Sequence, residues 1–265
     1  MAGKKKLPTR SLGTENVETP PEAVAAWAAA RKGRGGDLTT FRLETALCDQ
    51  GPIDQPCSGG TFYGDRWLKS IRGVEGNTLV GEPSPSDEDI AQDARAIIAI
   101  RRNAWASVPS CSSLGIMDRY YRDRDEFIPA IAGVYHDLAR TMRDHGIQGH
   151  VYLGTAFSES ELETLAGPRG IFFDETADKK ALTRLLEHQT TLVMDTRTVP
   201  VLEWLLGMYD IDELILLDPL PEILIKVMEV MDPTKIVAGG YCRAACRSYW
   251  DILAEQAVIP PTLQR

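Results

Sequence analysis

The sequence predicts an α/β fold, and the spacing of its elements favours a (β/α)8 barrel. Short apolar runs in the second half each end in an acidic or glycine-rich tip, and stretches with helical spacing separate them. Alternating strands and helices give parallel strands. From Phe41 onward the pattern gives eight candidate strands, which is the number that a barrel needs. They cover residues 41–47, 78–81, 105–109, 149–154, 170–174, 191–195, 213–217 and 235–239.

The alternative is an open doubly wound parallel sheet. The runs at 78–81 and 105–109 are the weakest of the eight, because the first is short and the second contains Pro109 near its end. If either run is not a strand, the open sheet becomes the better interpretation.

We expect residues 1–38 to form a short extension and residues 39–265 to form a single barrel-like domain. Lys4, Lys5, Lys6 and Arg10 precede any apolar periodicity, so we expect a flexible basic arm over the first twenty residues. A short helix follows from Pro21 to Lys32, because proline suits a first helical turn and glycines come directly after it. The arm either contacts an anionic partner or is simply a solubilising terminus.

Helix signals separate the candidate strands along the rest of the chain. Asp49 to Tyr63 predicts a loop rich in glycine and proline, and Ser86 is a good N-cap for a helix that runs to about Asn103. A long helical pattern covers about 123–144. Ser158 and Glu161 fit a capping box for the next helix. Further short helices are expected at about 158–166, 177–188, 198–208, 220–231 and 242–257.

Composition limits the classes of partner. A net charge of −9 argues against nucleic acid as the main partner, since binding its backbone needs a cationic surface. No apolar run reaches the length of a membrane span, and no signal-peptide core is present, so we expect a cytoplasmic protein. Five cysteines, an odd number in a reducing compartment, indicate thiols or metal ligands rather than a disulfide framework.

Acidic residues follow the candidate strands at 170–174, 191–195 and 213–217. Because the carboxyl ends of barrel strands face one mouth, these side chains form a candidate catalytic rim. It consists of Asp174, Glu175, Asp195 and Asp218. The rim could hold Mg²⁺ through oxygen ligands, or act as acid and base without a metal. Alternatively, each aspartate only caps the helix that follows its strand.

Four cysteines form a second candidate group. Cys48 and Cys57 flank the loop after the first candidate strand, and Cys242 and Cys246 follow the eighth. First and eighth strands are neighbours in a closed barrel, so four thiols would meet there and bind Zn²⁺ or an iron–sulfur cluster. The spacings are not those of known zinc knuckles, and a buried cysteine is often only a small apolar residue.

Basic and glycine residues complete the candidate site. Arg197 follows the sixth candidate strand, and Gly239, Gly240 and Arg243 lie at the end of the eighth. Loops in this part of a barrel often bind anionic groups through backbone N–H groups. We therefore expect a small anionic substrate; the alternative is that the glycine pair only turns the chain.

No motif in the sequence identifies a reaction. Phosphate-binding loops, dinucleotide fingerprints and the Gly-x-Ser-x-Gly elbow are absent. The rhythm of the last hundred residues is similar to that of barrels of the uroporphyrinogen decarboxylase and corrinoid methyltransferase group. The zinc methyltransferases of that group use a His-x-Cys pair, which is absent here, so the resemblance concerns the fold only.

Two functions remain open from sequence. The first is an enzyme, a lyase or transferase, acting on a small anionic substrate at the barrel mouth. The second is a non-catalytic accessory protein that binds a metal or metallocofactor through its cysteines and passes it to a partner. Apolar helix faces at 202–208 and 223–228 could also form a homo-oligomer surface.

Overall fold

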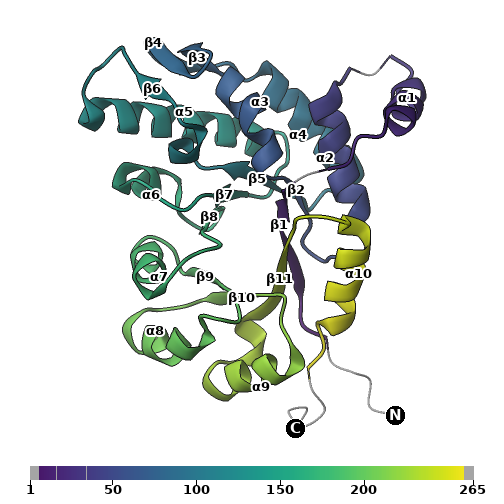
Figure 1. Ribbon diagram of the computed structural model, residues 1–265, viewed down its shortest axis with the longest axis vertical. Helices are drawn as coiled ribbons and strands as arrows, with labels where there is room; N and C mark the ends of the chain where they lie inside the picture. Colours follow the sequence, from purple (N-terminus) through teal and green to yellow (C-terminus); the bar gives the residue numbers. More distant parts are fainter. Residues whose placement is uncertain (1–5, 16, 34, 260–265) are drawn as a thin grey trace.

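The protein folds as a (β/α)8 barrel, as the sequence predicted. The computed structural model describes residues 6–15, 17–33 and 35–259. Parallel strands occupy the centre in Figure 1, and helices surround them. The barrel strands are β1 (Thr9–Thr14), β2 (Cys57–Gly59), β5 (Trp105–Pro109), β7 (His150–Leu153), β8 (Gly170–Phe173), β9 (Thr191–Met194), β10 (Glu213–Leu217) and β11 (Ile236–Cys242).

Two four-stranded sheets make up the wall of the barrel. Their orders are β1-β11-β10-β9 and β2-β5-β7-β8, and every neighbouring pair in both sheets is parallel. On one side the sheets are joined, because Ser11 N–H donates to the Gln55 carbonyl and Gln55 N–H donates to the Thr9 carbonyl, both at 3.0 Å. First and last strands in the chain are therefore neighbours, as a barrel requires.

On the other side, β8 and β9 are bridged by a side chain. The amide of Gln189 accepts a hydrogen bond from Phe172 N–H at 2.8 Å and donates to the carbonyls of Phe172 and Thr191, at 3.3 and 2.7 Å. Gln189 is buried, so it satisfies backbone groups that a neighbouring strand would normally pair.

Helices cover the outside of the barrel. They are α2 (Leu38–Asp49), α3 (Gly64–Lys69), α4 (Glu88–Ile100), α5 (Arg124–Asp144), α6 (Glu159–Leu165), α7 (Lys179–Leu186), α8 (Leu202–Met208), α9 (Pro221–Val230) and α10 (Cys246–Gln256). Helix α1 (Pro21–Ala30) has no buried residue and lies at the edge of the molecule in Figure 1, where Trp27 contacts Phe41 of α2. Among the described residues, no helix has both the length and the apolar composition that a bilayer span requires.

Side-chain alternation in the strands separates two kinds of core. Inward-facing residues fill the barrel itself, a cluster that includes Leu12, Val151, Ile171, Val193 and Ile215. Outward-facing residues such as Phe172 and Leu216 pack beneath the helices in separate clusters. Strands that are buried on both faces have continuous apolar sequences, so the strands in the second half of the chain could be predicted from the sequence.

Two of the eight expected barrel strands were wrong. Residues 41–47 belong to helix α2, which starts at a capping box between Asp37 and Thr40. Thr40, Leu43 and Leu47 are buried at helical spacing, a pattern that short alternation can imitate. Residues 78–81 are a strand, but they lie in β4 (Thr78–Pro85), outside the barrel.

The true first and second strands are β1 and β2. Both fall in segments expected to be a flexible arm and a loop, so the predicted domain boundary at residue 38 is wrong: β1 pairs with β11 inside the barrel. Their apolar content is low because the barrel interior at this point accommodates Arg10, Gly13 and Gly59. Lys4 and Lys5 lie outside the described residues.

A small antiparallel sheet extends from the barrel. Strand β3 (Ile71–Glu75) pairs with β4, and β4 pairs in parallel with the short β6 (Met117–Asp118). Figure 1 shows these strands at the top of the molecule, beside α5. They are insertions in the connections that flank β5, so they leave the barrel order unchanged.

Candidate functional site at the barrel mouth

A cavity of about 450 Å³ opens at the carboxyl ends of the strands. It lies on one half of the mouth, where β2, β5, β7, β8 and β11 end. Hydroxyl, acidic and aromatic side chains line it together with apolar residues: Thr61, Asp65, Ser113, Thr155, Phe173, Glu175 and Tyr241. This is the end of the barrel at which such folds carry their active sites.

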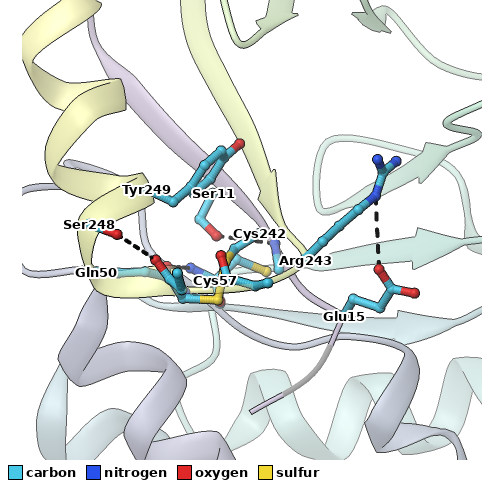
Figure 2. Close-up of a disulfide and its surroundings, with 12 residues drawn as sticks. Ser11, Glu15, Gln50, Cys57, Cys242, Arg243, Ser248 and Tyr249 are labelled. Atoms are coloured by element: carbon cyan, nitrogen blue, oxygen red, sulfur yellow. Dashed lines mark hydrogen bonds and ion pairs between the residues drawn. A yellow bond between two sulfur atoms is a disulfide. The ribbon is translucent and has the colours of Figure 1, made fainter. Parts of the chain in front are cut away.

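Glu175 and Arg243 are joined across this mouth. Glu175 follows β8 and Arg243 follows β11, which are not adjacent in the barrel, and an ion pair connects Arg243 Nη2 to Glu175 Oε1. The hydrogen bond and charge of Glu175 raise the pKa of Arg243. Arg243 Nε also lies 3.8 Å from Glu15 Oε2, as Figure 2 shows. A cation and two carboxylates thus meet beside the cavity.

Asp174 does not share this environment. Its Oδ1 accepts hydrogen bonds from the backbone N–H and the hydroxyl of Thr176, both at 2.8 Å. The side chain is 9% exposed and shapes the turn after β8. Of the two adjacent acids, Glu175 is therefore the one that lines the cavity.

Asp195 and Arg197 satisfy each other. Asp195 Oδ1 accepts from the backbone N–H groups of Arg197 and Thr198, at 2.8 and 3.2 Å, and Oδ2 pairs with the Arg197 guanidinium. Burial acts to raise the pKa of Asp195, but the hydrogen bonds from Arg197 outweigh it and hold the pKa low. This carboxylate stays ionised and is a poor proton donor.

Asp218 is held by Tyr249. The Tyr249 hydroxyl, on α10, donates to Asp218 Oδ1 at 2.6 Å. Burial raises the pKa of Asp218, and the hydrogen bond from Tyr249 opposes that shift. Asp218 also has a φ of 44°, in the left-handed region that aspartate tolerates better than most residues. Its backbone conformation and its partner fix the carboxylate at the end of β10.

The glycine pair does not form the expected anion-binding turn. Gly239 and Gly240 lie within β11, where Gly239 is paired with Leu217 and Arg10 in the flanking strands. A Cβ on Gly240 would lie 2.3 Å from the Tyr249 hydroxyl oxygen. Gly240 thus provides space for the Tyr249–Asp218 hydrogen bond.

The structure does not bring the four cysteines together. Cys242 and Cys246 form a disulfide, shown in Figure 2, so the expectation of separate thiols is wrong for this pair. Cys57 is buried in the barrel wall, where burial raises the pKa of its thiol, and Cys48 is exposed on α2. Their predicted meeting point depended on residues 41–47 being the first strand, which they are not.

No metal site emerges from the acids or the thiols. Within the residues that the structure describes, no three histidine, cysteine, aspartate or glutamate side chains are grouped as a bound ion would need. The rim carboxylates instead have separate protein partners: Thr176, Arg197 and Tyr249. Nothing in this arrangement fits zinc, an iron–sulfur cluster or Mg²⁺.

Two residues of the mouth, Tyr241 and Glu15, were not among the site residues proposed from sequence. Tyr241 is the last inward-facing residue of β11 and its ring lies 5.8 Å from that of Phe173. Burial raises the pKa of Tyr241, and hydrogen bonds from Thr61 oppose this. Glu15 could be placed only by knowing that residues 9–14 form β1. Tyr241 could have been predicted, because strand alternation from the inward-facing Val237 places it on the same face of β11.

Known proteins resemble this chain in fold only. No family model matches it, and no curated protein sequence matches it. Among solved structures, the B12-independent methionine synthase from Shewanella sp. W3-18-1, in complex with selenomethionine, is similar with a TM-score of 0.63. The alignment covers 96% of this chain and 97% of that chain, at 13% sequence identity.

A second solved structure has a similar fold. The putative B12-independent methionine synthase from Listeria monocytogenes has a TM-score of 0.58, with 95% of this chain and 96% of that chain covered at 14% identity. Since both alignments span nearly the whole of each chain, the similarity includes the complete barrel. At these identities it supports the fold and assigns no residue a role.

Proposed function

We propose that the protein is an enzyme that binds a small carboxylic acid at the barrel mouth and transfers a group to or from it. The observation that carries the proposal is the ion pair of Arg243 with Glu175 beside a cavity of about 450 Å³. A cation that is exposed, held only by carboxylates and next to a cavity is suited to exchange its partner for a substrate carboxylate.

The same exchange of partners would release Glu175 from its ion pair, so that it could act on the substrate. When a substrate carboxylate pairs with Arg243, the Glu175 carboxylate loses its cation and remains at the cavity wall. A carboxylate placed beside the bound substrate can act as a general base. Arg243 would thus bind the substrate and Glu175 would move a proton.

The two similar folds favour the transferase class over the lyase class. Both are described as methionine synthases, and one holds selenomethionine. An α-amino acid also suits this mouth, because Arg243 can take its carboxylate while Glu15 or Asp65 takes its ammonium group. Methionine-like amino acids therefore belong at the head of a substrate panel.

The proposal is tested by calorimetric titration with small acids, each compared with its amide. The panel contains amino acids, including methionine, and hydroxy acids. We expect at least one acid to bind while its amide does not, and Arg243→Gln to weaken that binding by about 10- to 100-fold, the effect of losing a charged hydrogen bond.

Two variants separate binding from chemistry. Glu175→Gln should retain binding of the acid and lose turnover, and Arg247→Gln is the matched control on an exposed arginine nearby. Equal binding of acids and amides, or unchanged binding in Arg243→Gln, would contradict the proposal.

A further inference from the structure

A disulfide closes a short loop at the end of β11. It joins Cys242, the last residue of β11, to Cys246, the first residue of α10. The three residues between them are exposed and belong to neither element. Arg243 is one of them, and Figure 2 shows its side chain extending from the disulfide toward Glu15. The residue that pairs with Glu175 at the mouth thus lies inside a ring of five residues closed by a covalent bond.

The two ends of this loop are anchored in different elements. Cys242 is buried in one apolar cluster with Trp250, and its carbonyl oxygen accepts a hydrogen bond from Glu15 N–H at 2.7 Å. At the other end, the carbonyl oxygen of Ala245 accepts a hydrogen bond from the Ser248 hydroxyl of α10 at 2.9 Å. The loop therefore connects a barrel strand to the first turn of a helix, and the disulfide limits the distance between them.

The backbone of Ala245 indicates that the loop is constrained. Its φ is 51°, in the left-handed region that a residue with a Cβ disfavours. Such conformations persist only where the surrounding structure holds them, and they are common in switch regions. The disulfide supplies a constraint, because it keeps the Cα atoms of Cys242 and Cys246 5.6 Å apart. Four extended residues would span about 13–14 Å, so the loop can lengthen only when the bond is open.

One of the two cysteines lies where a reductant can approach. Cys242 is fully buried, whereas Cys246 is half-buried and lines a hollow of about 600 Å³ beside α2 and α10. The first turn of a helix also opens more readily than its interior, which brings the Cys246 sulfur within reach of a small reagent. A helix start and a neighbouring cation, here Arg247, stabilise the thiolate that reduction produces. Exposed disulfides of this kind are the ones that are readily reduced.

We propose that the disulfide is a redox latch on the Arg243 loop, opened by a dithiol reductant. One thiolate of the reductant attacks the Cys246 sulfur, the bond between the two cysteine sulfurs breaks, and Cys242 leaves as a thiolate that takes up the proton that the reductant lost. The second thiol of the reductant then loses its proton and attacks the mixed disulfide. This step frees Cys246 as a thiol and converts the dithiol into its own disulfide. Two electrons pass to the protein, and residues 243–245 become free to move.

Opening the latch would regulate the mouth. Arg243 takes the substrate carboxylate in the proposed function, so this effect on binding rests on that function, whereas the movement of the loop does not. A mobile loop must be ordered again each time Arg243 binds an acid. Ordering the backbone of one residue lowers affinity by about 5- to 30-fold. We expect the reduced protein to bind its acid more weakly than the oxidised protein by this factor.

The test is limited trypsin digestion of the folded protein with and without prior treatment with dithiothreitol, followed by mass spectrometry. Trypsin cleaves after arginine, and a protease needs an extended segment, which the closed ring cannot supply. We expect cleavage between Arg243 and Ala244 to be at least about 10-fold faster after reduction, because cleavage follows the population of the open loop. Cleavage after the exposed Lys32, in the turn that follows α1, is the internal control and should not change.

Two cysteine variants make the test specific. Cys246→Ser lacks the bond, so it should be cleaved rapidly after Arg243 with or without the reductant. Cys48→Ser removes an exposed free thiol on α2 and should behave as the wild type does. Circular dichroism checks that the reduced protein remains folded. Calorimetric titration of both redox states with an acid that the mouth binds measures the expected loss of affinity.

Contrary results would overturn the latch. They are an unchanged rate of cleavage after Arg243, a disulfide that dithiothreitol does not reduce in the folded protein, and loss of the fold on reduction. Equal affinity for the acid in both redox states would contradict control of the mouth. Should Cys246→Ser not fold, the wild type in its two redox states decides, because it carries no substitution. Redox-dependent cleavage in a protein that binds no small acid would support the latch and count against the proposed function alone.

Discussion

At the scale of single residues, the partner of each acid decides what that acid can do. Three carboxylates predicted from sequence do end beside the mouth, yet Asp174, Asp195 and Asp218 are each occupied by a neighbouring side chain. Of the four acids, Glu175 is the one that lines the cavity, and its partner Arg243 is exposed, which is the basis of the proposed exchange. Sequence reasoning placed these acids at the carboxyl ends of the strands, but it could not assign their partners, because these depend on side-chain contacts between distant segments.

Gly240→Ala should destabilise the fold. The new Cβ would lie 2.3 Å from the Tyr249 hydroxyl oxygen, so the ring must move and its hydrogen bond to Asp218 must lengthen or break. We expect a loss of about 1–3 kcal/mol in the free energy of unfolding, measured by urea denaturation.

The matched control is Gly207→Ala in helix α8. A Cβ there has no atom within 4 Å, and alanine favours a helix, so this variant should gain up to about 1 kcal/mol. Equal effects of the two substitutions would show that the Tyr249 contact is not tight.

Asp93 should make stability depend on pH. It is buried among Arg66, Thr40 and Tyr63, and burial raises its pKa from 3.8 to about 6 while those partners oppose the shift. A raised pKa means that the folded state holds the proton more tightly. Its contribution to stability is therefore full below about pH 4 and is lost as the pH rises through 6.

The measurement compares the wild type with Asp93→Asn by urea unfolding between pH 4 and pH 7. The wild type should lose about 1–3 kcal/mol relative to the variant as the pH rises across this interval. Asp89→Asn removes an exposed partner of the same Arg66, and its unfolding free energy should change with pH as that of the wild type does. If the unfolding free energy of Asp93→Asn has the same pH dependence as that of the wild type, Asp93 does not titrate in this range.

At the scale of elements, strands buried on both faces were identified and the others were not. The runs from β7 to β11 are continuous and apolar, which only a strand between two packed faces requires. Strands β1 and β2 contain arginine, serine and glycine at buried positions, so their sequences carry little apolar signal. Helix α2 was mistaken for a strand because the signal at its start, Asp37 with Thr40, was overlooked.

Gln189→Leu should weaken the connection between β8 and β9. The substitution removes three hydrogen bonds and leaves the buried Phe172 N–H without an acceptor. We expect a loss of about 2–4 kcal/mol in unfolding free energy and faster amide exchange at Phe172. Gln256→Leu, at an exposed position on α10, is the control and should change stability by less than about 0.5 kcal/mol. A similar effect at both positions would contradict a bridging role.

At the scale of the whole molecule, the first described strand is part of the barrel wall and not an appendage. β1 pairs with β11 and is hydrogen-bonded to the segment before β2, so it connects the two sheets. This arrangement was not predictable from sequence, since the number of candidate strands already reached eight without it. A correct fold class was obtained with two of its eight strands misassigned.

Removal of residues 1–14 should therefore prevent folding, whereas removal of residues 1–5 should not. Without β1, the edge of β11 is unpaired and the buried Leu12 no longer fills the barrel. Circular dichroism and the cooperativity of thermal unfolding measure the difference. Cooperative unfolding of the shorter chain at an unchanged midpoint would show that β1 is dispensable.

The pairing of β1 with β11 also has a consequence for synthesis on the ribosome. β1 emerges before the other barrel strands, and its partner emerges only after all of them have been made. During translation, which adds about 5–20 residues per second, the edge of β1 that β11 later covers must wait for many seconds. Its sequence, with a buried arginine and a glycine at a φ of 114°, is a weak template for pairing with other chains. The same low apolar content that hid β1 from sequence analysis would then protect the nascent chain from aggregation.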